Sequence, residues 1–132
     1  MKIVYIYLIA TVIFFALDMV WLGAVAKNLY QKKLAFVISS EVNWPAAIIF
    51  YLLYIGGILF FAIHPALRAG QWQVALLHGV LLGALCYATY DLTNMATIKG
   101  WPLLITIVDI TWGGIITGVT ALSAYLLANR FL

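Results

Sequence analysis

The 132-residue chain is 67 % hydrophobic and only 8 % charged, and its mean hydropathy of +1.11 lies far outside the range of soluble globular domains. The composition therefore excludes a soluble enzyme and indicates one transmembrane domain over residues 1–132. The formal net charge of +3 is carried by short loops and chain ends, which favours contact with lipid headgroups over nucleic-acid binding.

Four apolar runs are each long enough to cross ~30 Å of hydrocarbon, which takes ~20 helical residues. They cover about 3–26, 44–64, 73–97 and 102–128. The first run is too long for the apolar core of a signal peptide and is interrupted by Asp18 and Trp21, so we interpret it as a span. The sequence predicts an all-α fold, an integral membrane four-helix bundle.

The connection between the first two runs, residues 27–43, is the longest. In "KNLYQKKLAFVISSE", Tyr30, Leu34 and Val37 share one helical face and polar residues take the other. This pattern predicts a short interfacial helix between helices 1 and 2. Basic residues are almost evenly divided between the two sides, and the basic helix favours its own side as cytoplasmic.

Three aspartates fall inside the predicted spans. Asp18 and Asp91 lie shortly before the ends of the first and third spans, and Asp109 lies shortly after the start of the fourth. At ~1.5 Å per residue, all three are expected ~10 Å inside the same face of the bilayer. Carboxylates are costly in lipid and should face one another or a wet cavity, so we expect a cluster.

A short repeat accompanies two of these aspartates. "DMVWLG" at 18–23 and "DITWGG" at 109–114 share the pattern DxxWxG, which places Asp18 with Trp21, and Asp109 with Trp112, on one helix face. Because the two spans run antiparallel, Trp21 is expected nearer the interface and Trp112 deeper. The two indoles would then form the rim and the floor of one pocket.

The candidate ligand-binding residues are Asp18, Trp21, Tyr90, Asp91, Thr93, Asn94, Asp109 and Trp112. Secondary candidates on the same side are Glu41, Asn43, Tyr87, Lys99 and Trp101. Carboxylates this close in low dielectric cannot all ionise, so the cluster would bind a proton, a cation or a polar headgroup. The alternative is structural: hydrogen bonds between helices, and capping of a helix end by "YDLTN".

Other patterns give weaker indications. His64 and His78 are expected close together, but no third ligand accompanies them, which favours a structural or interfacial role over a metal site. Small residues spaced four positions apart predict close helix contacts, within the bundle or between copies of the chain. They are Ala75, Gly79 and Gly83, then Gly114 and Gly118. Cys86 stands alone, and the motifs of phosphate loops, serine hydrolases, zinc proteases and haem attachment are absent.

Four stretches together resemble a bacterial family of small membrane proteins, the domain of unknown function 2177. They are "LDMVWLG", "FYLLYIGGILFFAIHPAL", "YATYDLTNMATIKGWP" and "DITWGG". The resemblance implies four transmembrane helices in the bacterial cytoplasmic (inner) membrane, and it assigns no catalytic residue. Its pattern contains Asp18, Trp21, Tyr90, Asp91, Thr93, Asn94, Trp101, Asp109, Trp112 and Gly113.

The leading hypothesis is a one-sided Asp and aromatic pocket that binds, or also translocates, a cation or small cationic solute. Four helices are too few for two gated halves, so transport would require a homo-oligomer. One alternative is a lipid-modifying enzyme or lipid-binding accessory protein at headgroup depth, although no nucleophile is evident and non-enzymatic roles are favoured. Another is a membrane assembly subunit. Beyond a proton or cation at the aspartates, no cofactor is predicted, and lipids are the expected partners.

Overall fold

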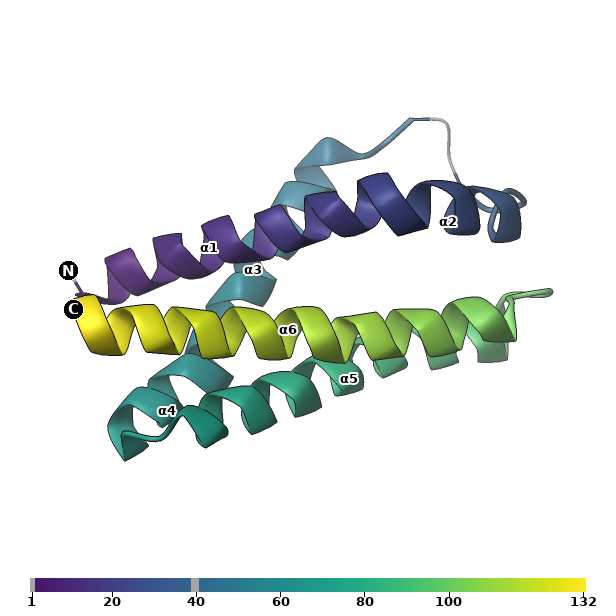
Figure 1. The fold of residues 1–132 in the computed structure, drawn as a ribbon. Coiled ribbons are helices and arrows are strands. Elements are labelled where there is room, and N and C mark those ends of the chain that lie inside the picture. Colours follow the sequence, from purple (N-terminus) through teal and green to yellow (C-terminus); the bar gives the residue numbers. More distant parts are fainter. Residues whose placement is uncertain (1, 39–40) are drawn as a thin grey trace.

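The computed structural model describes residues 2–38 and 41–132, and all regular structure in those residues is helical. The elements are α1 (Lys2–Trp21), η1 (Leu22–Ala26), α2 (Lys27–Lys33), α3 (Trp44–Ile58), η2 (Leu59–Ile63), α4 (His64–Ala69), α5 (Trp72–Thr97) and α6 (Leu103–Phe131). The π-helical segments η1 and η2 join their neighbours without a break, so the chain forms four long rods (Figure 1). Each rod is long and apolar enough to cross a membrane, which confirms the four predicted spans.

The first rod continues past its predicted end at residue 26 to Lys33. The helix expected between the first two spans is present as α2, and it extends α1 through η1 instead of standing apart. No proline interrupts 22–33, and Lys32 and Lys33 occupy the last turn, where cations interact favourably with the helix dipole. Ser39 and Ser40 of the predicted interfacial segment lie outside the described residues.

Glycines bring α5 and α6 into the most extensive helix contact of the bundle. A Cβ atom on Gly83 would lie 2.0 Å from the carbonyl oxygen of Gly113, and one on Gly79 would lie 2.9 Å from Cα of Gly118. These four residues form what we call the glycine seam. The small residues of α5 and α6 therefore serve packing within the bundle, where backbones approach too closely for any side chain.

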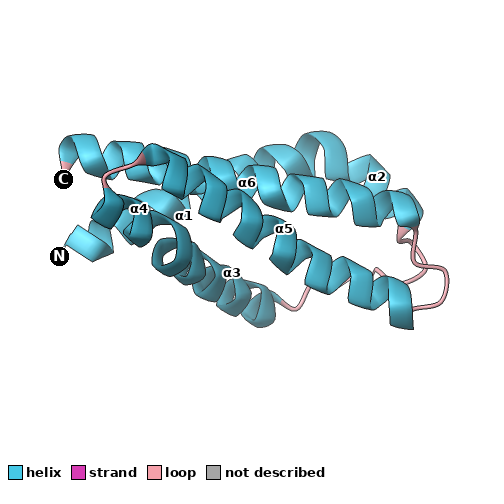
Figure 2. Cartoon of the chain, turned by 90° about the horizontal axis from the view of Figure 1, so that it is seen from below, coloured by secondary structure: helices cyan, strands magenta, loops and turns pink. Residues whose placement is uncertain are grey.

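The hydrophobic core lies around α6, which contacts α1, α4, α5 and η2. Fully buried Phe14 and Ile55 connect α1 and α3 to it, and Ile116 and Ala121 face them from α6. In Figure 1, α3 crosses the other rods obliquely, and both ends of the chain lie at the same end of the bundle. In Figure 2, α3 separates from α5 toward the end that carries α2.

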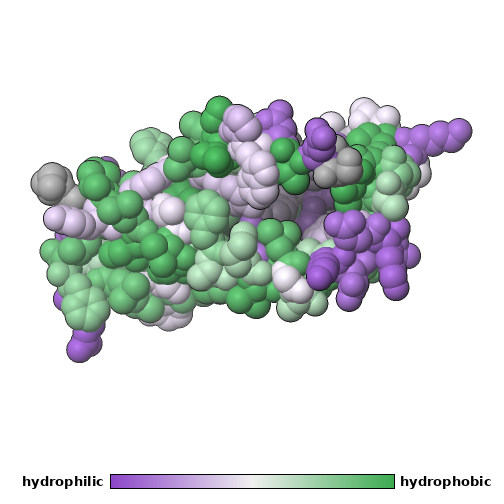
Figure 3. Space-filling view, turned by 90° about the horizontal axis from the view of Figure 1, so that it is seen from above, coloured by the Kyte–Doolittle hydropathy of each residue, from purple (hydrophilic) through white to green (hydrophobic). Residues whose placement is uncertain are grey.

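Apolar side chains cover most of the outer surface, as expected of a surface that faces lipid. Figure 3 shows them over most of the length of the bundle, with hydrophilic side chains gathered toward the end that carries α2. Many large hydrophobic residues on this surface are more than half exposed, among them Val12 at 68 % and Leu53 at 71 %. The described part of the chain is thus a multi-pass membrane protein with a polar end and a long apolar belt.

Candidate functional site

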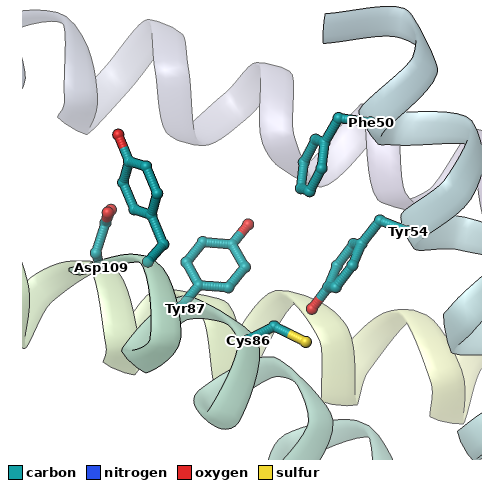
Figure 4. A pocket seen from close by; sticks show the side chains of 6 residues that line it. Phe50, Tyr54, Cys86, Tyr87 and Asp109 are labelled. Atoms are coloured by element: carbon teal, nitrogen blue, oxygen red, sulfur yellow. The ribbon is translucent and has the colours of Figure 1, made fainter. Parts of the chain in front are cut away.

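The separation of α3 from α5 leaves a cavity of about 330 Å³, which we call the aromatic crevice. Its lining residues are Phe50 and Tyr54 from α3, Cys86, Tyr87 and Tyr90 from α5, and Asp109 from α6. Figure 4 shows Phe50 and Tyr54 on one side, Tyr87 in the middle and Asp109 at the far end of the row. A carboxyl group therefore stands at one end of an opening with mainly aromatic walls.

Two contacts fix the walls of the crevice. The hydroxyl of Tyr54 hydrogen bonds to Oγ1 of Thr117 on α6 at 2.7 Å, in a buried position. The ring of Tyr87 lies directly on Gly113, where an added Cβ would come within 2.2 Å of the ring. Because Gly113 has no side chain, Tyr87 can occupy the space beside α6 and face Tyr54, with ring centroids 6.3 Å apart.

Asp109 is tied to the first rod. The hydroxyl of Tyr30 on α2 donates a short hydrogen bond to its carboxyl. Tyr30 in turn contacts the ring of Trp21 edge-on, with centroids 6.4 Å apart. The extension of α1 into α2 is what brings Tyr30 over α6, so the longer first rod positions one of the site carboxyls.

Asp91 is fully buried, with an exposed fraction of 0 %, and neither carboxyl oxygen has a hydrogen-bond partner. The carboxyl of Asp109 and the indole of Trp101 face it without making a hydrogen bond of acceptable geometry. Asp91 and Asp109 are therefore adjacent carboxyls, whereas the sequence predicts a cluster of all three aspartates. Buried polar groups are nearly always paired, so an unpartnered carboxyl beside another one is a feature that needs a proton or a cation.

Asp18 lies apart from this pair. Its carboxyl accepts a hydrogen bond of 2.5 Å from Tyr51 on α3 and faces the indole of Trp112. It is buried, with 7 % of its surface exposed, and it does not line the aromatic crevice. Asp18 therefore joins α1 to α3, which is the structural role that the sequence left open for any one of the aspartates.

The two tryptophans of the DxxWxG repeat stack on each other, with ring centroids 4.3 Å apart and planes 6° apart. The expectation that Trp21 and Trp112 form the rim and floor of a pocket is therefore wrong, because rings in contact leave no space for a ligand between them. Each aspartate lies three residues before its tryptophan on antiparallel helices, so Asp18 and Asp109 extend from the tryptophan stack in opposite directions along the bundle. The common depth holds for Asp91 and Asp109 and not for Asp18.

The remaining candidates are distributed over the polar end. Tyr90 lines the crevice and also a second groove, together with Glu41, Asn43, Asn94 and Trp101. Asn43 caps α3, where its side chain accepts a hydrogen bond of 3.2 Å from the backbone N–H of Ala46. Thr93 and Lys99 are exposed and line neither opening.

No group of three His, Cys, Asp or Glu side chains that could hold a metal ion occurs within residues 2–38 and 41–132. The three aspartates thus do not meet at one point. Two carboxyls and the rings beside them remain as the chemical core of the site.

Sequence reasoning missed several residues that build the site. The sequence pattern places Tyr30 on the apolar face of an interfacial helix, yet its hydroxyl reaches Asp109. Tyr51 and Tyr54 lie three residues apart in an apolar run, a spacing that signals one helix face carrying two hydroxyls. Phe50 and Cys86 carry no signal that separates them from lipid-facing residues.

The comparisons with known proteins agree with the membrane fold. A family model described as "Predicted membrane protein (DUF2177)" matches residues 3–126. No curated protein matches the chain. No solved structure matches it either.

Proposed function

The chain belongs to the DUF2177 family of predicted membrane proteins, and we propose that its aromatic crevice binds a lipophilic organic cation. The observation that carries this proposal is that Asp109 is the one charged residue among the six that line a cavity of about 330 Å³. Four of the others are aromatic, and the fifth is Cys86. An ammonium group at the carboxyl end with an apolar body along the rings matches this lining.

Electrostatics favours a cation at this position. Aromatic faces attract cations, most strongly where water is excluded. Asp91 adds a second carboxyl beside Asp109, and no ion pair to a basic side chain is seen at either residue within the described part of the chain. A bound cation would supply the positive charge that two adjacent carboxyls in low dielectric require.

An organic cation suits the crevice better than a hydrated metal ion. Magnesium and calcium require several oxygen ligands, whereas the crevice offers one carboxyl and phenol groups amid apolar walls. Its volume lies at the lower end of the range for small-molecule sites, which are mostly apolar with few polar groups. A compact cation with an aromatic or short aliphatic body is therefore the expected ligand class.

The ligand would enter from the bilayer. Phe50 and Tyr90, on the two sides of the opening, are 51 % and 58 % exposed on the apolar surface of the bundle. The crevice belongs to one half of the bundle, so translocation to the other face would require a second copy of the chain. Residence in the bacterial inner membrane, suggested by the family, is part of this proposal.

The test compares a cation with an uncharged isostere. Benzyltrimethylammonium and neopentylbenzene have the same shape and differ in charge. The melting temperature of the detergent-solubilised protein should rise with benzyltrimethylammonium and not with neopentylbenzene, by the equivalent of about 2.7 kcal/mol at one hundred times Kd.

Two variants separate the crevice from general electrostatics. Asp109→Asn should abolish the rise in melting temperature. Asp18→Asn makes the same chemical change at a carboxyl outside the crevice and should retain it. Equal stabilisation by neopentylbenzene would show an apolar or lipid site instead, and an unaltered response of Asp109→Asn would refute the proposal.

A further inference from the structure

A second opening lies at the opposite end of the bundle, close to the chain ends. It is a broad hollow of about 820 Å³ between the end of the second rod and the start of α5, and we call it the basic hollow. Its polar lining consists of His64, Arg68 and His78, and its apolar lining includes Phe60, Phe61 and Pro65. The two histidines do come together, as the sequence suggested.

A proline explains how one histidine is held. In a regular α-helix, the carbonyl of Phe61 would accept a hydrogen bond from the N–H of residue 65, which is a proline and has none. The chain forms the π-helical segment η2 just before this point, and Nδ1 of His78 lies 3.2 Å from the Phe61 carbonyl oxygen. Since a carbonyl only accepts, Nδ1 is the donor, and this hydrogen bond fixes the orientation of the His78 ring at the hollow.

The charge of the hollow has one sign. The chain contains four acidic side chains, Asp18, Glu41, Asp91 and Asp109, and none of them lines the hollow. Arg68 is exposed there and offers a planar fork of donors that matches phosphate oxygens. The complementary ligand is an anion with several acceptor oxygens.

The surroundings indicate the source of that anion. Phe60 and Phe61 are 69 % and 56 % exposed on the side of the hollow that continues into the apolar belt. The basic groups lie at the end of a membrane span, where the headgroups of a bilayer begin. We propose that the basic hollow is a binding site for the phosphate of an anionic phospholipid, with the acyl chains along the two phenylalanines.

This site goes beyond the proposed function, because it lies at the other end of the bundle and shares no lining residue with the aromatic crevice. Phospholipid binding at the basic hollow does not require a cation in the aromatic crevice. Its loss should leave stabilisation by benzyltrimethylammonium unchanged, so the two proposals can fail independently.

The experiment measures lipid adducts on the full chain by native mass spectrometry from detergent. The three probes are dioleoylphosphatidylglycerol, dioleoylglycerol, which lacks the phosphate, and glycerol 3-phosphate, which lacks the acyl chains. We expect the phospholipid to bind with a Kd at least about tenfold below that of either fragment, a difference of one charge-assisted interaction.

Matched variants locate the site. Arg68→Gln should raise the Kd for the phospholipid about tenfold, and Arg68→Lys should recover part of the loss. Arg130→Gln removes the same charge at the same end of the bundle but outside the hollow, and should leave the Kd within about twofold. Arg68 and Arg130 are both exposed, so neither change disturbs the core.

Three results would overturn the proposal. Equal binding of dioleoylglycerol would show that the phosphate is not recognised. Equal binding of glycerol 3-phosphate would assign the hollow to a soluble phosphate compound. Equal weakening by Arg68→Gln and Arg130→Gln would reduce the effect to general surface charge.

Discussion

The two sides of α5 differ in how closely a neighbouring helix approaches. On one side, α6 lies against it along the glycine seam, where no Cβ atom fits at Gly79 or Gly83. On the other side, η2 packs on α5 but α3 barely touches it, and the aromatic crevice occupies the space between them. Glycine thus closes one interface, while large rings hold the other open, and the candidate site lies on the open side.

The largest expected effect concerns the closed side. Gly83→Ala should lower the free energy of unfolding by roughly 3 kcal/mol, because the new methyl group would overlap the Gly113 carbonyl and the Thr117 hydroxyl. The measurement is unfolding by SDS titration in mixed micelles, followed by circular dichroism. Gly57→Ala is the control, since a Cβ there has no neighbour within 4 Å and should be neutral or slightly stabilising. Equal losses of unfolding free energy at the two positions would contradict the close backbone packing at the glycine seam.

The rod that borders the open side, α3, should depend on a single hydrogen bond to α1. Tyr51→Phe removes the donor to Asp18 and should lower the free energy of unfolding by about 1.5 kcal/mol, because a buried carboxyl loses its partner. Tyr5→Phe makes the same change on the exposed face of α1 and should have no measurable effect. If both variants unfold at the wild-type SDS concentration, Tyr51 does not hold α3 to α1.

A substitution at Asp91 is expected to stabilise the protein, unlike the two changes above. Asp91→Asn should raise the free energy of unfolding of the ligand-free protein by about 1 kcal/mol, because the amide keeps the shape, removes one of two adjacent carboxyls and can donate to Asp109. The same SDS titration measures it. Asp18→Asn should bring no such gain, since Asp18 already has a donor in Tyr51. A loss of stability in Asp91→Asn would show that the Asp91 carboxyl makes a stabilising interaction other than its contact with Asp109.

The last prediction concerns the accessibility of the cysteine in the crevice and not the stability of the protein. Cys86 is the one cysteine of the chain and is half-buried, so N-ethylmaleimide can report on access to it. At ten times Kd, benzyltrimethylammonium should slow labelling about tenfold, because about a tenth of the sites remain free. Asp109→Asn should show no protection. Protection that persists in this variant would place the ligand elsewhere.

The four spans could be predicted because length and apolarity decide whether a segment crosses a bilayer, and both are properties of the local sequence. The packing role of the glycines could also be predicted from the local sequence, because they recur at every fourth position. The end of the first rod could not be predicted from the sequence. Nothing in 22–33 stops a helix, so the boundary between a span and an interfacial helix leaves no mark in the sequence.

Distances across the bundle could not be predicted from the sequence. Counting residues places Asp18, Asp91 and Asp109 at similar depths, but the stack of Trp21 on Trp112 fixes the offset between α1 and α6 and separates Asp18 from the other two. Which tyrosine reaches which aspartate depends on that offset as well. Asp91 and Asp109 do lie together, because their helices are joined by a short turn that leaves little freedom of register.

The short turn between α5 and α6 also has a consequence for the order of assembly. Contacts between neighbours in sequence close small loops and form rapidly, so the glycine seam is expected to form early once both helices are inserted. Yet α1 and α3 leave the ribosome first and must wait in the bilayer for the later pair. Tyr51 lies on α3 and binds Asp18 on α1, so these two spans can shield their own carboxyl from lipid during that wait.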